Sequence, residues 1–271
     1  MGLTAFVLGG GGVLGAAEVG MLQALAEHGI APGLVIGTSV GAINGAAYAM
    51  APGTEMAQVL VRMWVELDSC GVFGGSVLSQ LNTFARTRTH LFDNERLREL
   101  LTTHLRASRI EELAVPFQCV AACVERAVGH WFTAGPLIEA VLASCAVPGL
   151  LPAVQIGGEH FLDGGLVDSL PVARAITLGA CDIYALHVGR LEQPLRAPRW
   201  PWEVASTAFE IARRSRFTDA MANLPASVNV HVLPSGATDV PIANLRFRSN
   251  RGVRERIERA HEATAEYLSR R

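Results

Sequence analysis

Short apolar runs alternate with helix-like patterns in the first part of the chain. Residues 3–8 and 34–36 are apolar runs of the length typical of buried strands. Between them, residues 13–27 carry apolar side chains at helical spacing, and residues 40–50 form a second helical pattern that is rich in glycine and alanine. This order of elements is typical of parallel strands joined by crossover helices. It therefore predicts an α/β fold.

The same alternation continues to the end of the chain. Further strands are expected at residues 115–122, 130–133, 183–188 and 228–233, with a tight hairpin at 154–162. Further helices are expected at residues 55–67, 95–105, 137–145, 171–178, 203–224 and 253–270. Because there is no internal repeat and no shift of composition, residues 1–271 are predicted to form one domain. Within it, residues 68–92 are a candidate cap and residues 190–271 are a C-terminal extension.

Composition narrows the class of protein. Of the 271 residues, 50% are hydrophobic and the formal net charge is −2, so we expect a globular chain without the basic surface of nucleic-acid-binding proteins. The five cysteines lack the spacing of a secreted disulfide scaffold, which favours a reducing compartment and a cytoplasmic location. Cys119 and Cys123 match no common zinc spacing, and we expect no metal. No apolar run is long enough to predict a transmembrane helix.

A serine stands between two glycines directly after the second apolar run. Gly37, Ser39 and Gly41 form the pattern Gly-x-Ser-x-Gly, and the helix of small residues follows. In a strand-to-helix turn, this pattern holds a serine in a strained conformation where larger side chains two positions away would collide. The amino end of the following helix favours negative charge beside the serine. The pattern predicts a nucleophile, although a serine that only caps the helix would fit the same position.

A run of glycines follows the first apolar run. Gly10, Gly12 and Gly15 satisfy the Gly-x-Gly-x-x-Gly pattern of dinucleotide-binding proteins, which also needs an acidic residue at the end of the next strand. That strand ends at Ile36 without a carboxylate. We therefore favour the other interpretation, in which the backbone N–H groups of Gly10, Gly11 and Gly12 form an anion-binding loop beside the serine.

The serine needs a base to remove its proton. Eight histidines occur in the chain, but none lies in a late loop of the kind that supplies a triad histidine. Asp163 is the stronger candidate, because it ends a predicted strand and is followed by Gly164 and Gly165, which allow close approach of the backbone. Burial would raise the pKa of this aspartate and improve its match to a serine hydroxyl. Asp168 is interpreted as a structural residue before Pro171.

These motifs, in this order, resemble the patatin-like phospholipase family of the bacterial type. The likeness covers residues 3–190 and includes the segments at 91–94, 143–148 and 166–171. It implies a three-layer α/β/α fold with a mostly parallel central sheet. It also implies a catalytic dyad of Ser39 and Asp163 without a histidine, an oxyanion hole in the Gly10–Gly12 loop, and neither metal nor cofactor. Family members are lipid acyl hydrolases that form an acyl-serine intermediate, so the implied substrate is a lipid or another acyl ester.

One residue departs from the glycine motif of that family. The position before the last glycine usually carries Arg or Lys, and here it is Leu14. The backbone N–H groups of the loop do not depend on this side chain, so the departure leaves open the preference for phospholipids rather than hydrolysis itself. Two alternatives also stay open: an esterase with a Ser–His–Asp triad, and a lipid-binding relative that has lost most of its turnover.

Two surface predictions concern the C-terminal part of the chain. The loop at residues 190–202 carries Trp200 and Trp202 beside arginines, which fits either a peripheral membrane contact or a loop packed under the next helix. The charged helix at residues 253–270 is interpreted as a solvated face. The sequence leaves the oligomeric state open.

Overall fold

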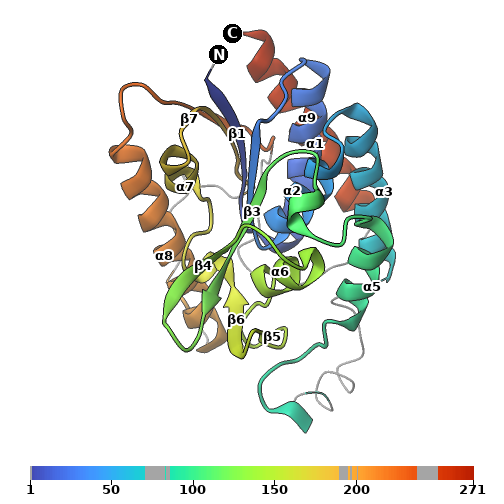
Figure 1. Cartoon of the computed structure of the whole chain (residues 1–271), viewed down its shortest axis with the longest axis vertical. Helices are drawn as coiled ribbons and strands as arrows, with labels where there is room; N and C mark the ends of the chain where they lie inside the picture. Colours follow the sequence, from blue (N-terminus) through green and yellow to red (C-terminus); the bar gives the residue numbers. More distant parts are fainter. Residues whose placement is uncertain are drawn as a thin grey trace.

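The chain folds in layers around one sheet (Figure 1). The computed structural model describes residues 2–70, 83, 86–188, 195, 197–199, 201–236 and 250–271. Its strands are β1 (Leu3–Leu8), β2 (Leu34–Thr38), β3 (Phe117–Cys123), β4 (Val128–Phe132), β5 (Val154–Ile156), β6 (Glu159–Asp163), β7 (Ala180–Leu186) and β8 (Asn229–Leu233). Its α-helices are α1 (Ala16–Glu27), α2 (Val40–Met50), α3 (Thr54–Cys70), α5 (Glu95–His104), α6 (Leu137–Ser144), α7 (Val172–Thr177), α8 (Pro201–Ala222) and α9 (Asn250–Ser269). Three short 3-10 helices are η1 (Gly12–Gly15), η2 (Ile110–Glu112) and η3 (Gly164–Leu166).

The sheet has a parallel centre and an antiparallel edge. Strands β3, β2, β1, β7 and β8 are parallel neighbours in this order. Strands β4, β5 and β6 add antiparallel pairs beside β3. The prediction of an α/β fold with a mostly parallel central sheet is therefore confirmed.

Helices cover both faces of the sheet because its central strands are apolar on both sides. In β1, Phe6 and Leu8 belong to one apolar cluster. Ala5 and Val7, which alternate with them, belong to the other. The first cluster includes residues of α1, α2, α3, α5, α6 and α9, and the second includes residues of α7 and α8. Figure 1 shows the same division, which confirms the three predicted layers.

Strand β3 sets the relative position of the two strands that end at the candidate site. Strand β4 pairs with residues 119–123 along one edge of β3, so β2 and β6 share the other edge. Thr38, at the end of β2, pairs with Val120. Asp163, at the end of β6, pairs with the next residue, Ala121. Because β2 and β6 run in opposite directions along this edge, their carboxyl ends meet.

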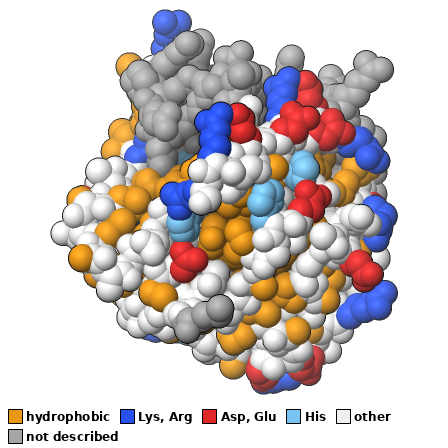
Figure 2. Space-filling view, turned by 90° about the horizontal axis from the view of Figure 1, so that it is seen from above, with side chains coloured by type: hydrophobic (Ala, Val, Ile, Leu, Met, Phe, Trp, Pro, Cys, Tyr) orange, Lys and Arg blue, Asp and Glu red, His pale blue; other side chains and the backbone are white. Residues whose placement is uncertain are grey.

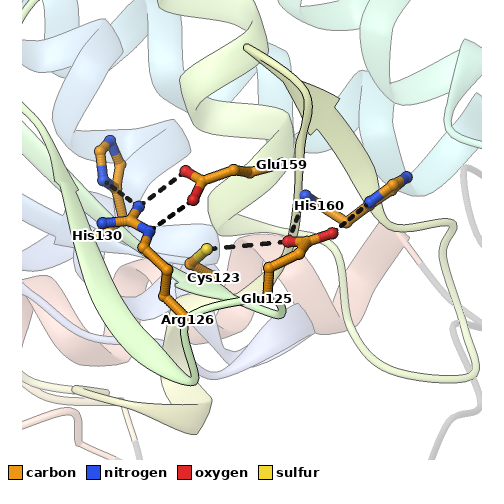
Figure 3. A network of polar contacts seen from close by, with 6 residues as sticks. All are labelled: Cys123, Glu125, Arg126, His130, Glu159 and His160. Atoms are coloured by element: carbon orange, nitrogen blue, oxygen red, sulfur yellow. Dashed lines mark hydrogen bonds and ion pairs between the residues drawn. The ribbon is translucent and has the colours of Figure 1, made fainter.

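A polar network holds the β5–β6 hairpin against the β3–β4 turn (Figure 3). The carboxylate of Glu125 accepts a hydrogen bond from the backbone N–H of His160 at 2.9 Å and contacts its Nδ1 at 2.7 Å. These bonds lower the pKa of Glu125 to about 2. Nε of Arg126 lies 2.7 Å from Oε1 of Glu159. The network therefore joins the start of β6 to the turn between β3 and β4.

Helix α9 packs against the rest of the fold along one side. Val253, Ile257 and Ala260 are buried in the same apolar cluster as residues of α1. The two helices approach closely because Gly20 has no side chain, and a Cβ atom there would overlap the backbone of Ile257. The charged residues of the opposite side, such as Arg254 and Glu258, are exposed, as predicted for a solvated face, and the apolar residues pack inward.

Two predictions fall largely outside the described residues. The candidate cap at 68–92 includes residues 71–82, 84 and 85, and the tryptophan loop includes Trp200 and the side chain of Trp202. Both therefore stay predictions.

The surface combines apolar and charged areas. On the face drawn in Figure 2, hydrophobic side chains gather near the centre, and most charged side chains lie around them. The exposed large hydrophobic residues among those described are Val124, Val128, Val204 and Ile211. None of the described helices is both long enough and apolar enough to cross a membrane.

Candidate active site

Ser39 occupies a strained turn between β2 and α2. Its φ angle is 54° and its ψ angle is −123°, which is a rare conformation for a residue with a side chain. Both flanking glycines are required by close backbone contacts. A Cβ atom on Gly37 would lie 2.6 Å from the Cα atom of Ala42, and one on Gly41 would lie 2.5 Å from the carbonyl carbon of Leu8. The Gly-x-Ser-x-Gly pattern thus has the steric reason expected from the sequence.

The structure brings Ser39 and Asp163 together. Oγ of Ser39 donates a hydrogen bond of 2.6 Å to Oδ2 of Asp163, although the residues are 124 positions apart in the chain. The other carboxylate oxygen, Oδ1, accepts a hydrogen bond of 2.7 Å from the N–H of Gly165. Both side chains are buried, with 8% of Ser39 and 2% of Asp163 exposed.

Burial controls the charge of Asp163. Removal of water from around the carboxylate raises its pKa from the usual value near 3.8 to about 6, and the hydrogen bonds from Ser39 and Gly165 limit the rise. The carboxylate is therefore a stronger base than a solvated aspartate, and it is still mostly ionised at neutral pH. A hydrogen bond from a hydroxyl to such a carboxylate can transfer its proton.

No described histidine is hydrogen-bonded to Ser39 or Asp163. The eight histidines lie within the described residues, and several of them are bonded to other groups. For example, Nε2 of His231 contacts Asp182 at 2.8 Å, and Nε2 of His261 contacts Glu27 at 2.7 Å. The geometry therefore joins the serine to an aspartate directly.

Three hydrogen bonds hold the two ends of the dyad in place. The N–H of Ser39 donates to Oγ of Ser144 at 2.9 Å. The N–H of Asp163 donates to the carbonyl of Ala146 at 2.9 Å. The hydroxyl of Thr38 donates to the carbonyl of Asp168 at 2.8 Å. Ser144 had no assigned role in the sequence analysis, and the only available signal was its place in the family-like segment at 143–148.

The glycine loop lies beside Ser39. A Cβ atom on Gly10 would sit 3.4 Å from the Cβ atom of Ser39. However, the N–H of Gly10 already donates to the carbonyl of Ser169 at 2.9 Å. Gly11 and Gly12 are exposed, and within the described part of the chain their N–H groups have no backbone acceptor. Gly12 has a φ angle of 55°, a conformation that favours glycine.

Gly15 closes the loop by close packing and by one hydrogen bond. A Cβ atom there would lie 2.7 Å from Cγ1 of Val40 and 3.1 Å from Cζ2 of Trp64. The carbonyl of Gly15 accepts a hydrogen bond of 3.0 Å from Nδ2 of Asn44. The third glycine of the fingerprint therefore lets the loop approach the start of α2 closely.

A buried polar network that the sequence analysis missed lies below the loop. Asn44 of α2 donates to Oε2 of Glu18 at 2.7 Å and accepts from Nε1 of Trp64 at 2.8 Å. Glu18 is completely buried, which raises the pKa of its carboxyl group well above the usual range. Hydrogen bonds from Asn44 and from the backbone of Gly9 limit this rise. A glutamate on the apolar side of a predicted helix was the available signal.

Asp168 lies next to the dyad but does not join it. Burial raises the pKa of Asp168 to about 6, and the positive charge of Arg216 limits the rise. Its backbone, rather than its side chain, contacts the turn, through the hydrogen bond from Thr38. Arg216 of α8 also donates a hydrogen bond to the carbonyl of Leu166, in the loop after Asp163.

Comparison with known proteins places the chain in a family. The family model described as patatin-like phospholipase matches residues 6–176. Lysophospholipase nte1 of Emericella nidulans is 34% identical over 186 residues, which are 69% of this chain and 12% of that protein. Patatin-like phospholipase domain-containing protein 7 of Mus musculus is 29% identical over 191 residues, which are 70% of this chain and 14% of that protein. This chain therefore spans about an eighth of the length of these relatives.

The crystal structure of VipD from Legionella pneumophila is 14% identical, with a TM-score of 0.49, and the match covers 99% of this chain and 67% of that one.

The matched region contains the turn, the glycine loop and the buried aspartate. Ser39 and Asp163 both lie between residues 6 and 176, and this region is more than half of the chain. The order of motifs in the sequence predicts the same family. The chain belongs to the patatin-like phospholipase family.

Proposed function

We propose that this protein is a serine acyl hydrolase that cleaves lipid or other acyl esters, with Ser39 as nucleophile and Asp163 as base. The observation that carries the proposal is the 2.6 Å hydrogen bond between Oγ of Ser39 and Oδ2 of Asp163 in a buried, strained turn. Membership of the family supports the reaction class. Relatives named as lysophospholipases support a lipid substrate.

In the acylation step, Oγ of Ser39 attacks the carbonyl carbon of the ester and forms a new C–O bond. The hydroxyl proton moves to Oδ2 of Asp163, and the carbonyl oxygen becomes an oxyanion. When the tetrahedral intermediate collapses, the bond to the leaving alcohol breaks. The alcohol takes the proton from Asp163, which leaves an acyl-serine and an ionised aspartate.

Deacylation repeats the same proton transfers with water. Asp163 accepts a proton from a water molecule as the oxygen of that water forms a bond to the acyl carbon. When this second tetrahedral intermediate collapses, the bond between the acyl carbon and Oγ of Ser39 breaks, Asp163 returns the proton to Oγ, and the carboxylic acid is released. The pKa of about 6 suits both steps, because the carboxylate is ionised at neutral pH yet accepts a proton more readily than a solvated aspartate. The two steps need no further base.

The oxyanion is proposed to bind the N–H groups of Gly11 and Gly12. Gly10 belonged to the predicted set, but its N–H is already bonded to the carbonyl of Ser169. Gly11 and Gly12 are exposed and directly follow Gly10, whose Cβ position lies 3.4 Å from the Cβ atom of Ser39. The amino end of α2, directly after Ser39, adds a favourable dipole.

A hydrolysis assay with matched variants tests this function. Wild type, Ser39→Ala, Asp163→Asn and the exposed control Ser108→Ala are assayed on a p-nitrophenyl ester, lysophosphatidylcholine and a monoacylglycerol. We expect the two dyad variants to lose at least about 10³-fold in kcat, and Ser108→Ala to match wild type. Equal activity in all four proteins would contradict the proposal. The relative rates on the three esters distinguish a phospholipase from an acylglycerol lipase.

We also propose that the enzyme works in the cytoplasm, at the surface of membranes that present its substrate. Cys119, Cys123, Cys145 and Cys181 are free thiols, which supports a reducing compartment. Co-sedimentation with phosphatidylcholine vesicles tests the membrane contact, and the absence of any bound fraction would oppose it.

A further inference from the structure

Arg256 of α9 reaches the loop that holds the proposed oxyanion donors. Its Nη1 donates a hydrogen bond of 3.0 Å to the carbonyl oxygen of Val13. Val13 lies in η1, directly after Gly11 and Gly12. Residues 9–15 contain no charged side chain, so the guanidinium group supplies a positive charge that the loop itself lacks.

The glycine loop depends on such external support. Four consecutive glycines have more conformational freedom than other residues, and an ordered loop must restrict it. On the upstream side, Gly9 donates to the carbonyl of Leu186 at 3.2 Å and Gly10 donates to that of Ser169 at 2.9 Å. On the downstream side, Arg256 binds the loop through Val13. The two exposed glycines are thus held between anchors on both sides.

The bond from Arg256 also begins a chain of hydrogen bonds that leads to Gly12. The carbonyl of Val13 shares a peptide group with the N–H of Leu14, which donates to the carbonyl of Gly11 at 3.2 Å. That carbonyl shares a peptide group with the N–H of Gly12. Hydrogen bonds in such a chain polarise one another, so the charge of Arg256 makes the N–H of Gly12 a stronger donor.

The position of Arg256 is set by the packing of α9. Ile257, the next residue, is buried against α1, where Gly20 allows the two helices to touch. Val253 and Ala260 are buried on the same side of the helix. Loss of the guanidinium group therefore leaves the apolar contact of α9 intact, which makes the role of Arg256 separable from that of the helix.

We propose that Arg256 is a positioning residue for the oxyanion loop, holding the Val13 peptide and strengthening the N–H of Gly12 as a donor to the oxyanion. The inference rests on the proposed function in that Gly12 is taken as an oxyanion donor. It assigns a role in the site to a helix outside the region that the family model matches.

Kinetics of matched charge variants test the role in the reaction. Arg256→Met removes the bond, Arg256→Lys keeps the cation, and Arg254→Met removes the same charge from the exposed side of the same helix. Because the oxyanion is absent from the bound ester and develops in the transition state, we expect Arg256→Met to lower kcat about tenfold with KM changed less than about twofold. Arg254→Met stays within about twofold of wild type, and Arg256→Lys recovers part of kcat. Equal kcat values in Arg256→Met and Arg254→Met, or a change in KM alone, would overturn the proposal.

Hydrogen exchange tests the anchoring without using activity. In Arg256→Met, amides in residues 9–15 are expected to exchange faster than in wild type and Arg254→Met, while those of α9 keep their wild-type rates. Unchanged exchange in the loop, or faster exchange throughout α9, would overturn a local anchoring role. If wild type and Ser39→Ala are equally inactive, the proposed function fails, and the exchange result still decides whether Arg256 anchors the loop.

Discussion

Residues 6–176 and the residues that follow them contribute to the site in different ways. The first region supplies Ser39 and Asp163, whose side chains are buried and directly bonded. The second region supplies two guanidinium groups, from Arg216 of α8 and Arg256 of α9. Each of these binds a backbone carbonyl in one of the two loops that surround the dyad.

The two regions differ in how tightly the surrounding structure fixes the groups that they supply. Backbone contacts leave room only for glycine on either side of Ser39, and the register of β3 brings Asp163 to it. The arginines instead extend from the two C-terminal helices and bind backbone carbonyls of the loops, and Arg216 is exposed to solvent. Buried groups have few alternative partners, whereas water can replace an exposed donor. We therefore expect large effects from changes in the first region and graded effects from changes in the second.

The largest effect on activity is expected for Asp163→Asn. The amide cannot accept the proton of Ser39, so kcat should fall about 10³-fold with little change in the fold. Asp168→Asn is the matched comparison, since burial also raises the pKa of Asp168 but its side chain does not bind Ser39. Steady-state kinetics should show a loss of less than about tenfold for Asp168→Asn. Similar losses of kcat in both variants would contradict the assignment of Asp163, rather than Asp168, as the base.

Gly41→Ala tests the steric requirement of the turn. The added Cβ atom would lie 2.5 Å from the carbonyl carbon of Leu8, so α2 and β1 must separate. We expect the free energy of unfolding to fall by about 3 kcal/mol in denaturant titrations. Gly252→Ala in α9 is the control, because its Cβ atom meets nothing within 4 Å. It should raise stability by about 0.5–1 kcal/mol, as alanine does in a helix; equal losses in both variants would contradict the steric account.

The raised pKa of Asp163 predicts that the site lowers the stability of the fold at neutral pH. The folded state holds its proton up to about pH 6, whereas the unfolded chain loses it near 3.8, so stability falls as pH rises between these values. Asp163→Asn removes this dependence and should be more stable than wild type at pH 7, by up to about 3 kcal/mol. Below pH 4 the difference should vanish. Thermal unfolding of both proteins from pH 3.5 to 8 measures this difference in stability. A difference that stays constant across this range would contradict the raised pKa of Asp163.

Arg216→Met should give the smallest effect. Its bond to the carbonyl of Leu166 is exposed, and Asp163 keeps its own bonds to Ser39 and Gly165. We expect kcat to fall by about twofold to threefold, less than for Arg256→Met. Steady-state hydrolysis by Arg216→Met and Arg256→Met, measured on the same ester, gives this comparison. A larger loss in Arg216→Met would mean that the aspartate loop, rather than the glycine loop, depends more on the C-terminal helices.

The elements that hold the proposed nucleophile and base could be predicted, because the sequence patterns that cause them are local. The apolar runs at 3–8 and 34–36 predict β1 and β2, and the glycines around Ser39 follow from contacts within one turn. Asp163 could be located at the end of a strand, but its contact with Ser39 depends on two strands sharing one edge of β3. The pairing of Asp163 with Ser39 was therefore predicted from the resemblance to a family, because the spacing of residues along the sequence does not show which strands are neighbours.

The hydrogen bonds that support the site could not be predicted, because each of them joins residues that are distant in the chain. The N–H of Gly10 is occupied by Ser169, which changes the proposed oxyanion donors to Gly11 and Gly12. Arg256 is one of many charged residues in a terminal helix whose pattern predicts only solvent exposure. Hydrogen bonds to backbone carbonyls carry no side-chain signal at the accepting residue. Such contacts therefore become visible only in the folded chain.

The pH dependence of covalent labelling tests most directly whether Asp163 activates Ser39. A fluorophosphonate is reacted with wild type and Asp163→Asn from pH 4 to 8, and the adduct is mapped by peptide mass spectrometry. We expect an adduct on Ser39 whose rate of formation rises about tenfold per pH unit and levels off above the pKa of Asp163, about 6. In Asp163→Asn, labelling should be slow and nearly independent of pH. Labelling of Asp163→Asn at the wild-type rate, with the same pH profile, would contradict this role of Asp163.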